Sequence, residues 1–196
     1  MGHLLEFGFC DPGIQALWKP CRVVGTAVTV RTSALDSGVV HVAIDLAEAG
    51  DVLVIDRNGD TKHACWGEMT SLAAKRKGLA GTIVDGPATD IMEIAEMGYP
   101  VYCRGASAIT TTSTGAEGEI NTPVQVGGVP VHPGDLIVAD ANGVLVLTPE
   151  AAAAVIEASE AREKREAWVR AELHTGRALS DISGAAARVR GRIQGT

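Results

Sequence analysis

Hydrophobic residues in the first half of the chain follow two different spacings. Four runs rich in apolar, mostly β-branched residues predict strands, at 23–31, 52–56, 82–84 and 101–103. Three intervening segments, each followed by a glycine, are predicted as helices, at 36–49, 68–77 and 91–97. Strands that alternate with helices are typical of a substantially parallel sheet, so the chain is predicted to have an α/β fold.

The pattern then changes. Residues 105–133 hold many Gly, Thr, Pro and Val residues without a helical period, which predicts loops and antiparallel strands. The sequence GDLIVAD at 134–140 echoes GDVLVID at 50–56, so both strands are expected to begin from similar turns. Asn142-Gly143 predicts a hairpin, with a return strand over 144–147.

A long helix is predicted near the C-terminus. Thr148-Pro149-Glu150 combines an N-cap, a first-turn proline and an acid, and the helix is expected to reach about Thr175. Its second half, 160–172, is dense in charges of both signs, which indicates either a solvated helix or an arm that reaches a neighbouring subunit. Residues 177–196 are rich in Gly, Arg and Ala and are expected to form a flexible tail after a single domain, 1–176.

The composition narrows the class of protein. The chain has 196 residues, 46% hydrophobic but only 4% aromatic, so one domain with an aliphatic core is expected. The net charge is −7, and acidic residues interrupt the basic ones of the C-terminal region, which argues against binding of nucleic acid. The four cysteines lack C-x-x-C spacing, and neither a membrane-length apolar run nor a signal peptide is indicated. We therefore expect a cytoplasmic protein with buried thiols that does not bind membranes.

The segment from Gly67 to Asp90 is the strongest candidate for a functional site. Gly67 would allow a ligand to approach the backbone closely, because it has no Cβ. The amides of Glu68, Met69 and Thr70 would then be free first-turn donors for a carboxylate or a phosphate. The alternative is that Gly67 only makes a tight turn.

Glu68 and Asp90 stand at the starts of two helices that are linked by one strand. They suit a hard cation such as Mg²⁺, which needs only one or two carboxylates besides water and substrate oxygens. The carboxyl ends of parallel strands are also where α/β sheets bind ligands. The alternative is that each acid caps its helix, because Asp90-x-x-Glu93 has the spacing of a capping box. Spacing alone leaves both interpretations open.

Other catalytic arrangements find little support. His41 lies inside a predicted helix and is expected to be packed, and His63 is a minor candidate for lining a pocket. No Ser-His-Asp order, P-loop or G-x-G-x-x-G motif occurs.

Several motifs together resemble the family that joins 4-hydroxy-4-methyl-2-oxoglutarate aldolases to the RraA-type regulators of ribonuclease activity. The motifs lie within 10–175 and are DPGIQALW, GTAVTVR, GDVLVID, GEMTSLAAKRKGLAGTIVDG, the region around Thr122-Pro123-Val124, and GDLIVADANGVLVL. The resemblance implies a swivelling-domain-like β/β/α sandwich with a central βαβ region and a C-terminal helix. It also implies a homotrimer or homohexamer with sites between subunits, and a chain that begins inside the family's usual N-terminal helix, at Met1.

The family's enzymes are metal-dependent pyruvate aldolases that often also decarboxylate oxaloacetate. By the resemblance, Asp90 would be catalytic and would ligate Mg²⁺ or Mn²⁺, and Glu68 would assist through a water molecule. The backbone at Gly67, Met69 and Thr70 would hold the carboxylate of the substrate.

The resemblance also assigns residues outside this segment, and it exposes one departure. An acid from the neighbouring subunit's C-terminal helix, Glu163 or Glu166, would complete the outer shell of the metal. The family's aldolases carry an arginine in the substrate site where this chain has Thr89, which offers one hydrogen bond instead of a guanidinium fork. Arg57 and Arg104 are the candidates to supply the missing cation.

Three functions follow as expectations. The first is a divalent-metal-dependent lyase of the class II pyruvate aldolase or oxaloacetate decarboxylase type, acting on a small 2-oxo acid such as 4-hydroxy-4-methyl-2-oxoglutarate. The second is a non-catalytic RraA-type regulator that binds other proteins, and the third is a family enzyme with an altered substrate. The retained Gly67, Glu68 and Asp90 favour the first, whereas Thr89 favours the second.

Overall fold

A computed structural model describes residues 8–33 and 35–194 of the chain. The chain forms two compact units, residues 2–152 and residues 153–196. The boundary between the units falls within the long C-terminal helix, and each unit is described by itself. The single domain expected over 1–176 stays a prediction. The expectation about the family's N-terminal helix concerns residues that lie outside the described part of the chain.

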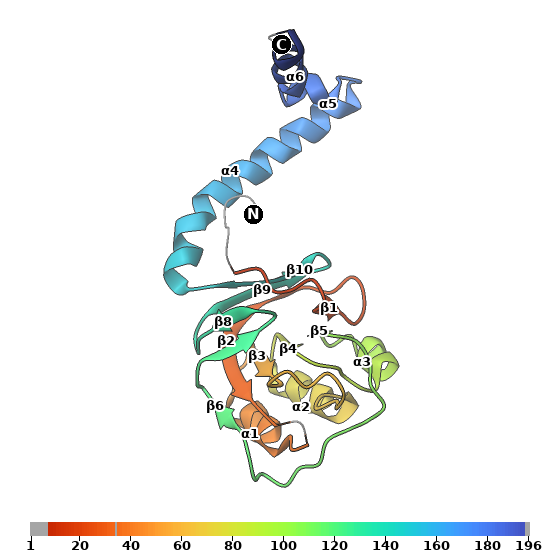
Figure 1. The fold of residues 1–196 in the computed structure, drawn as a ribbon, viewed down its shortest axis with the longest axis vertical. Coiled ribbons are helices and arrows are strands. Elements are labelled where there is room, and N and C mark those ends of the chain that lie inside the picture. The colour runs from red at the N-terminus through yellow and green to blue at the C-terminus, as the bar shows by residue number, and fades with distance from the viewer. Residues whose placement is uncertain (1–7, 34, 195–196) are drawn as a thin grey trace. The chain divides into compact units, whose positions relative to one another are not determined.

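The first unit is built on one eight-stranded sheet (Figure 1). Its strands are β1 (Gln15–Ala16), β2 (Val23–Arg31), β3 (Asp51–Asp56), β4 (Gly81–Val84), β5 (Val101–Cys103), β6 (Glu119–Ile120), β9 (Leu136–Asp140) and β10 (Gly143–Leu147). The strand order is β1-β5-β4-β3-β2-β9-β10, with β6 paired to β2. Strands β2 to β5 are parallel, and β1, β6, β9 and β10 pair antiparallel with their neighbours.

The sheet curls until its two edges almost meet. The segment before β1 reaches β10 through a bridge between Phe9 and Leu145, and the Cys10 amide donates to the Val144 carbonyl at 2.9 Å. A separate hairpin, β7 (Val124–Val126) with β8 (Val129–Val131), packs against the inner face of the curled sheet. Near closure leaves few unpaired strand edges, as in barrels.

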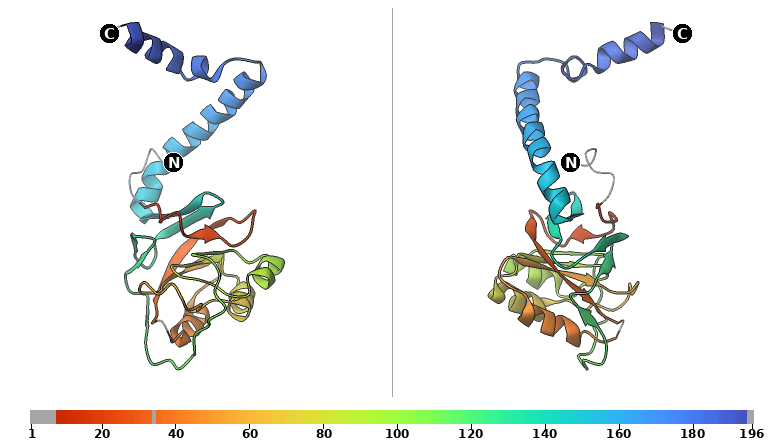
Figure 2. Two further views of the ribbon diagram at one scale, coloured as in Figure 1. Left: turned by 45° about the vertical axis from the view of Figure 1, so that its right-hand side comes forward. Right: turned by 90° about the vertical axis from the view of Figure 1, so that its left-hand side faces the viewer.

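Three helices cover the outer face of the parallel strands (Figure 2). They are α1 (Gly38–Leu46), α2 (Glu68–Lys77) and α3 (Ile91–Met97). Strand β3 shows how the sequence separates the two faces, because Leu53 and Ile55 pack under the helices whereas Val52 and Val54 face the hairpin side. Side chains of a strand alternate between faces, so a run of buried residues serves two cores at once.

The elements predicted for residues 23–147 are confirmed; most of their boundaries agree, and the others are shifted by one to three residues. The echo between GDVLVID and GDLIVAD is confirmed as well. In each copy the glycine has a positive φ, 92° at Gly50 and 91° at Gly134. Each aspartate then accepts a hydrogen bond from the amide three residues before it, Asp51 from Glu48 at 2.8 Å and Asp135 from His132 at 2.7 Å. The same seven-residue pattern therefore builds the same turn twice.

Two cations of α2 tie together the ends of the three helices. The ammonium group of Lys75 donates to the Met97 carbonyl in the last turn of α3, at 2.5 Å. Lys77 donates to the Asp45 carbonyl in the last turn of α1, also at 2.5 Å. Cations at helix C-termini are favourable because the last carbonyls lack partners within the helix.

An extended segment, residues 105–116, crosses the carboxyl ends of the parallel strands, and we call it the strap. It makes parallel bridges to the three loops that lead into the helices. The bridges pair Ala106 with Ala88, Thr110 with Ala64 and Thr112 with Asp36. Each of these partners lies two to four residues before the first residue of α3, α2 or α1, so one segment sets the relative height of all three helix starts.

The buried carboxylate of Asp36 clamps the far end of the strap. It accepts hydrogen bonds from the Thr114 hydroxyl and from the amides of Gly38, Thr114, Gly115 and Ala116. The Thr114 hydroxyl, followed by these amides, lowers the pKa of Asp36 well below its ordinary value, although burial acts in the opposite direction. The ionised carboxylate therefore holds the strap to the start of α1.

The second unit is helical. It continues α4 (Pro149–His174), which begins in the first unit, and adds α5 (Leu179–Ile182) and α6 (Ala185–Gln194). The long helix is confirmed within one residue at each end, and none of its side chains is buried. The sequence predicts no helices beyond 176, so α5 and α6 are a difference from that expectation; the flexibility of this segment stays a prediction.

Two further findings bear on the sequence-based expectations. The prediction that His41 is packed is wrong, because the side chain is exposed on α1, where its Nδ1 lies 3.1 Å from the Ser113 hydroxyl. Among the residues that the structure describes, no helix combines the length and the apolar character needed to cross a membrane.

The Asp36 clamp predicts a pH-dependent stability. Because its pKa is lower in the folded than in the unfolded protein, the clamp stabilises the fold above the unfolded pKa of about 3.9 and loses this effect as the pH falls below it. We expect Asp36→Asn to lower the midpoint of thermal unfolding at pH 7 and the difference from wild type to shrink between pH 4 and pH 3. Asp45→Asn, at an exposed position of α1, is the control. A difference that stays constant over this pH range would contradict the clamp.

Candidate functional site

Two loops that follow neighbouring parallel strands meet at one point. The loop between β3 and α2 ends at Gly67, and the loop between β4 and α3 ends at Asp90. The amide of Glu68 donates a hydrogen bond of 3.0 Å to Oδ2 of Asp90. The Thr89 hydroxyl donates to Oδ1 of the same carboxylate at 3.2 Å. The structure thus brings together the segment ends that the sequence singles out, at the carboxyl edge of the sheet.

Gly67 is required by the space that Asp90 occupies. Its φ of −156° is ordinary extended backbone, so no special conformation demands a glycine. A Cβ at this position would lie 2.6 Å from Oδ2 of Asp90 and 2.7 Å from Cγ2 of Thr89. The close approach predicted for a ligand is therefore made, in this chain, by the chain's own carboxylate, and the tight-turn alternative does not account for the glycine.

Asp90 does not act as a helix cap. The sequence allows a capping box with Glu93, but the Asp90 side chain makes no capping hydrogen bond to α3. Its backbone is left-handed, with a φ of 53°, a conformation that costs energy in a residue with a side chain. The capping interpretation of Asp90 is therefore wrong, and the strained backbone instead turns the carboxylate across to the first turn of α2.

The first turn of α2 presents further donors. The Gly67 amide donates to the Thr70 hydroxyl at 2.9 Å, and the hydroxyl can donate back to the Gly67 carbonyl. Within the described part of the chain, no acceptor is found for the amides of Met69 and Thr70. Free first-turn amides attract anions because of the positive end of the helix dipole. The site can therefore hold a cation at Asp90 and an anionic group at α2, side by side.

The residues present fit a divalent cation only in part. Each Asp90 oxygen accepts one protein hydrogen bond and has acceptor capacity left, and the side chain is exposed. Glu68 is half-buried at the adjoining helix start. Within residues 8–33 and 35–194, no three His, Cys, Asp or Glu side chains gather closely enough to bind a metal ion on their own. One chain thus offers the Asp90 carboxylate and an acid at the adjoining helix start, and Mg²⁺ can use one or two carboxylates where water and substrate provide the other ligands.

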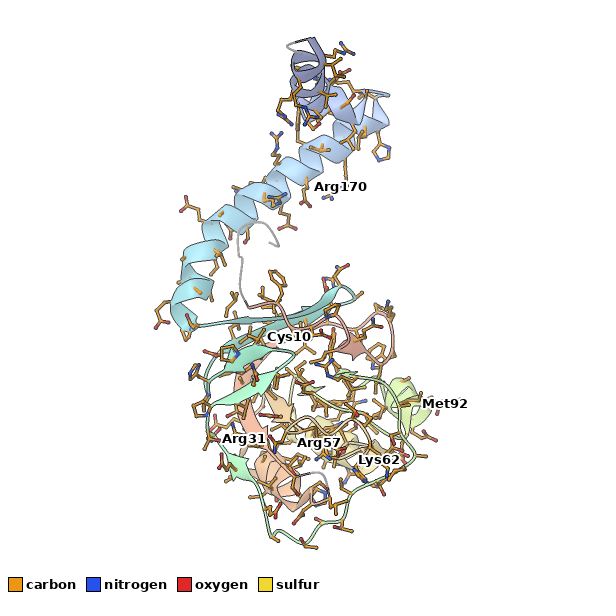
Figure 3. All side chains as sticks on the ribbon, in the orientation of Figure 1. Cys10, Arg31, Arg57, Lys62, Met92 and Arg170 are labelled. Atoms are coloured by element: carbon orange, nitrogen blue, oxygen red, sulfur yellow. The ribbon has the colours of Figure 1, made fainter. Side chains whose placement is uncertain are left out.

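The two arginines considered as replacements for the missing cation bind other groups. Arg57 is fully buried inside the first unit (Figure 3), where its guanidinium donates to the Ser33 carbonyl, the Asp60 carboxylate and the His63 carbonyl. Arg104 forms ion pairs with Asp85 and, at 3.0 Å, with Asp11. Both guanidinium groups therefore hold loops together through these contacts.

The remaining candidates lie elsewhere. Nδ1 of His63 lies 3.0 Å from the Asp60 carboxylate, which also binds Arg57. Glu163 and Glu166 belong to α4 in the second unit, where Glu166 lies 3.5 Å from Arg162. Their predicted role in a neighbouring subunit stays a prediction.

Cysteine chemistry is not supported by the environment of the thiols. The four cysteines are free and buried, as the sequence predicts. Burial raises the pKa of Cys10 to about 12 and the pKa of Cys65 to about 11, and it raises the pKa of Cys21 and Cys103 as well. Because the thiolate is the nucleophile, thiols with such pKa values are inert near neutral pH.

Sequence reasoning missed the residues that hold the two loops in place. They are Trp66, directly before Gly67, and the strap residues that pair with Ala64 and Ala88. A signal for Trp66 exists in the sequence, because it is the only large aromatic residue between strands β3 and β4. The strap has no such signal, because its pairing partners lie 18 to 76 positions earlier in the chain and follow no local pattern.

Comparison with known proteins gives this arrangement a context. Residues 4–146 match the sequence model of the RraA-like family, described as Aldolase/RraA. A protein of Halalkalibacterium halodurans named "Putative 4-hydroxy-4-methyl-2-oxoglutarate aldolase" is 42% identical over 134 residues, which are 68% of this chain and 63% of that protein. The aligned part is thus less than two thirds of that relative's length.

Two solved structures are similar in fold. A protein from Pseudomonas syringae, described as uncharacterized, superposes with a TM-score of 0.80 and 27% identity, over 93% of this chain and 85% of that one. The RNA-processing inhibitor RraA from Thermus thermophilis has a TM-score of 0.67 and 28% identity, over 75% of this chain and 89% of its own. These likenesses confirm the predicted α/β fold with a nearly closed sheet and helices.

The crowding around Gly67 predicts the effect of a single methyl group. We expect Gly67→Ala to push the Asp90 carboxylate away from the Glu68 amide and to destabilise the fold by about 1–3 kcal/mol, as overpacking of a tight site does. The Glu68 amide resonance in NMR spectra and the unfolding free energy would report these two effects. Gly191→Ala, where nothing lies within 4 Å of the added Cβ, should not destabilise the protein. An unchanged Glu68 amide in Gly67→Ala would contradict the assigned contact.

Proposed function

The chain belongs to the RraA-like (Aldolase/RraA) family, and from this premise we propose that it is a divalent-metal-dependent lyase acting on a small 2-oxo acid. The proposed reaction is retro-aldol cleavage or decarboxylation, of the class II pyruvate aldolase type. The observation that carries the proposal is the Asp90 carboxylate, which a strained backbone directs to the first turn of α2. A protein that needed Asp90 only as a cap would place its carboxylate on α3.

The residues of the site have distinct proposed tasks. Asp90 and, through water, Glu68 would hold Mg²⁺ or Mn²⁺, which when bound supplies a Lewis acid next to the substrate carbonyl. The free amides of Met69 and Thr70, with the backbone at Gly67, would bind the carboxylate of the 2-oxo acid. Thr89 would contribute one hydrogen bond at the edge of the same site.

For oxaloacetate, the proposed reaction is a decarboxylation. The bond between the leaving carboxylate carbon and the adjacent methylene breaks, and carbon dioxide departs. The electron pair stays on the three-carbon fragment, which takes a proton from water to become pyruvate. The fixed donors of α2 would orient the substrate so that this bond lies in the reactive geometry, which is the contribution expected from positioning.

Assembly and location complete the proposal. We propose a homotrimer or homohexamer in which an acid from a neighbouring α4, Glu163 or Glu166, adjoins the site. A single chain leaves the carboxylate of Asp90 exposed, which supports a site that a second subunit completes. The free, buried cysteines support a reducing compartment, and we propose the cytoplasm.

A non-catalytic regulator that binds other proteins is the second candidate. Thr89 favours it, because a neutral side chain stands where the family's aldolases carry an arginine, while Arg57 pairs with Asp60 and Arg104 pairs with Asp11 and Asp85. The similarity to a structure described as an RNA-processing inhibitor also supports it. A family enzyme with an altered substrate is the third candidate, for the same reason.

Replacement of Asp90 by asparagine tests the lyase directly. Asparagine tolerates the left-handed backbone and keeps the shape, but it lacks the charge that a cation needs. With oxaloacetate and Mn²⁺ we expect Asp90→Asn to lower the rate of pyruvate release about 10²–10³-fold. Glu96→Gln, an exposed acid of α3, should leave the rate unchanged. Equal release by wild type and Asp90→Asn, or none by either, would reject the lyase and favour the regulator.

Replacement of Thr89 by arginine separates a weakened aldolase from an enzyme with another substrate. A guanidinium group at this position could bind the substrate in two places and stabilise developing negative charge. If the chain is a family aldolase, Thr89→Arg should raise kcat/KM for 4-hydroxy-4-methyl-2-oxoglutarate by about tenfold or more. Thr89→Lys, a cation without the fork, is the matched comparison. A fall in kcat/KM in both variants would point to a substrate that requires the smaller side chain.

A further inference from the structure

Trp66 lies directly beneath the point where the two loops meet. Its side chain is only 1% exposed and stacks on the ring of Tyr99, with centroids 6.3 Å apart and an angle of 21° between the planes. The indole N–H donates to the hydroxyl of Ser71 at 2.8 Å. Ser71 is fully buried in the first half of α2, so the side chain of Trp66 is hydrogen-bonded to the buried face of this helix.

The backbone of Trp66 holds the other loop. Its carbonyl accepts a hydrogen bond of 2.9 Å from the amide of Thr89, the residue before Asp90. One residue therefore contacts α2 through its side chain and the Thr89–Asp90 pair through its main chain. Glu68 lies two residues after Trp66, and Asp90 directly follows Thr89. The Glu68 amide and the Asp90 carboxylate form the 3.0 Å hydrogen bond of the site.

The stack under Trp66 is itself anchored to the sheet. The Tyr99 hydroxyl lies 3.1 Å from the hydroxyl of Thr82 on β4, and both side chains are buried. The Tyr99 carbonyl accepts a hydrogen bond of 2.8 Å from the indole N–H of Trp18. Because buried polar atoms are costly to leave without partners, these bonds restrict the position of the ring on which Trp66 rests.

We infer that Trp66 is a positioning residue that sets the distance between the first turn of α2 and the Asp90 carboxylate. The inference rests on the proposed function for its consequence, because that distance separates the proposed cation site from the proposed anion site. Trp66 and Ser71 are both buried, so neither side chain would reach a substrate at the surface. A phenylalanine would fill much of the same volume and keep the stack, but it could not donate to Ser71.

The test uses the full-length protein with Trp66→Phe, Ser71→Ala and the double variant. Tyr102→Phe is the matched control, because it removes one buried side-chain hydrogen bond, from the Tyr102 hydroxyl to the Cys21 carbonyl at 3.0 Å, in the core cluster that does not contain Trp66. The first readout is hydrogen exchange of the Glu68 and Thr89 amides, measured by NMR. The second is the affinity for Mn²⁺, measured by calorimetry without any turnover.

We expect Trp66→Phe and Ser71→Ala each to speed exchange of the Glu68 amide about fivefold or more, the effect of losing one hydrogen bond. Mn²⁺ binding should weaken about tenfold, as it does when the groups that orient a ligand are removed. The double variant should resemble either single variant, because both remove the same bond. Tyr102→Phe should lower the unfolding temperature without either local effect.

The outcomes separate this inference from the proposed function. Exchange of the Glu68 amide that is equally fast in Trp66→Phe and Tyr102→Phe would overturn the positioning role, even if the protein is a lyase. Conversely, wild-type protein that binds no Mn²⁺ and releases no pyruvate would reject the proposed function. The exchange measurement would still decide whether Trp66 sets the geometry of the two loops.

Discussion

The contact between the Glu68 amide and the Asp90 carboxylate is the constraint on which the candidate site depends. It joins residues 22 positions apart, and it exists only because Gly67 has no side chain. The left-handed backbone of Asp90 has a cost that the surrounding contacts must offset. Such local strain is common at functional sites. Here it directs the Asp90 carboxylate away from α3, which it would otherwise cap, and toward the N-terminus of α2.

The architecture explains how this contact can be held. Parallel strands β3 and β4 end at the same edge of the sheet, so the loops that follow them are neighbours from the start. The strap then pairs with both loops and with the loop before α1, and the Asp36 clamp fixes its far end. On the core side, Trp66 is hydrogen-bonded to α2 through its indole and to the Thr89 amide through its carbonyl. The site is thus held from the surface and from the core.

The fixed Asp90 carboxylate, the free amides of α2 and the neutral Thr89 support ligand binding more directly than they support catalysis. A cation and a small anion can be accommodated beside each other, which agrees with membership of a family that includes relatives named for an aldolase activity. Stabilisation of negative charge during bond cleavage normally uses a cation or several donors. In this chain Arg57 and Arg104 bind other groups, and the proposed metal would supply this stabilisation.

The sequence by itself determined the helices and strands from β2 to β5 and the hairpin of β9 and β10, predicted the twin turns at Gly50 and Gly134, and singled out Gly67, Glu68 and Asp90. These features are local, because periodicity, glycine placement and capping residues act within a few positions of the chain. Tertiary structure alone decided that the Asp90 carboxylate leaves its own helix, that Gly67 makes room for it, and that Trp66 and the strap fix the two loops. Those outcomes depend on which loops the sheet brings together, and contacts between distant segments leave no periodic trace in the sequence.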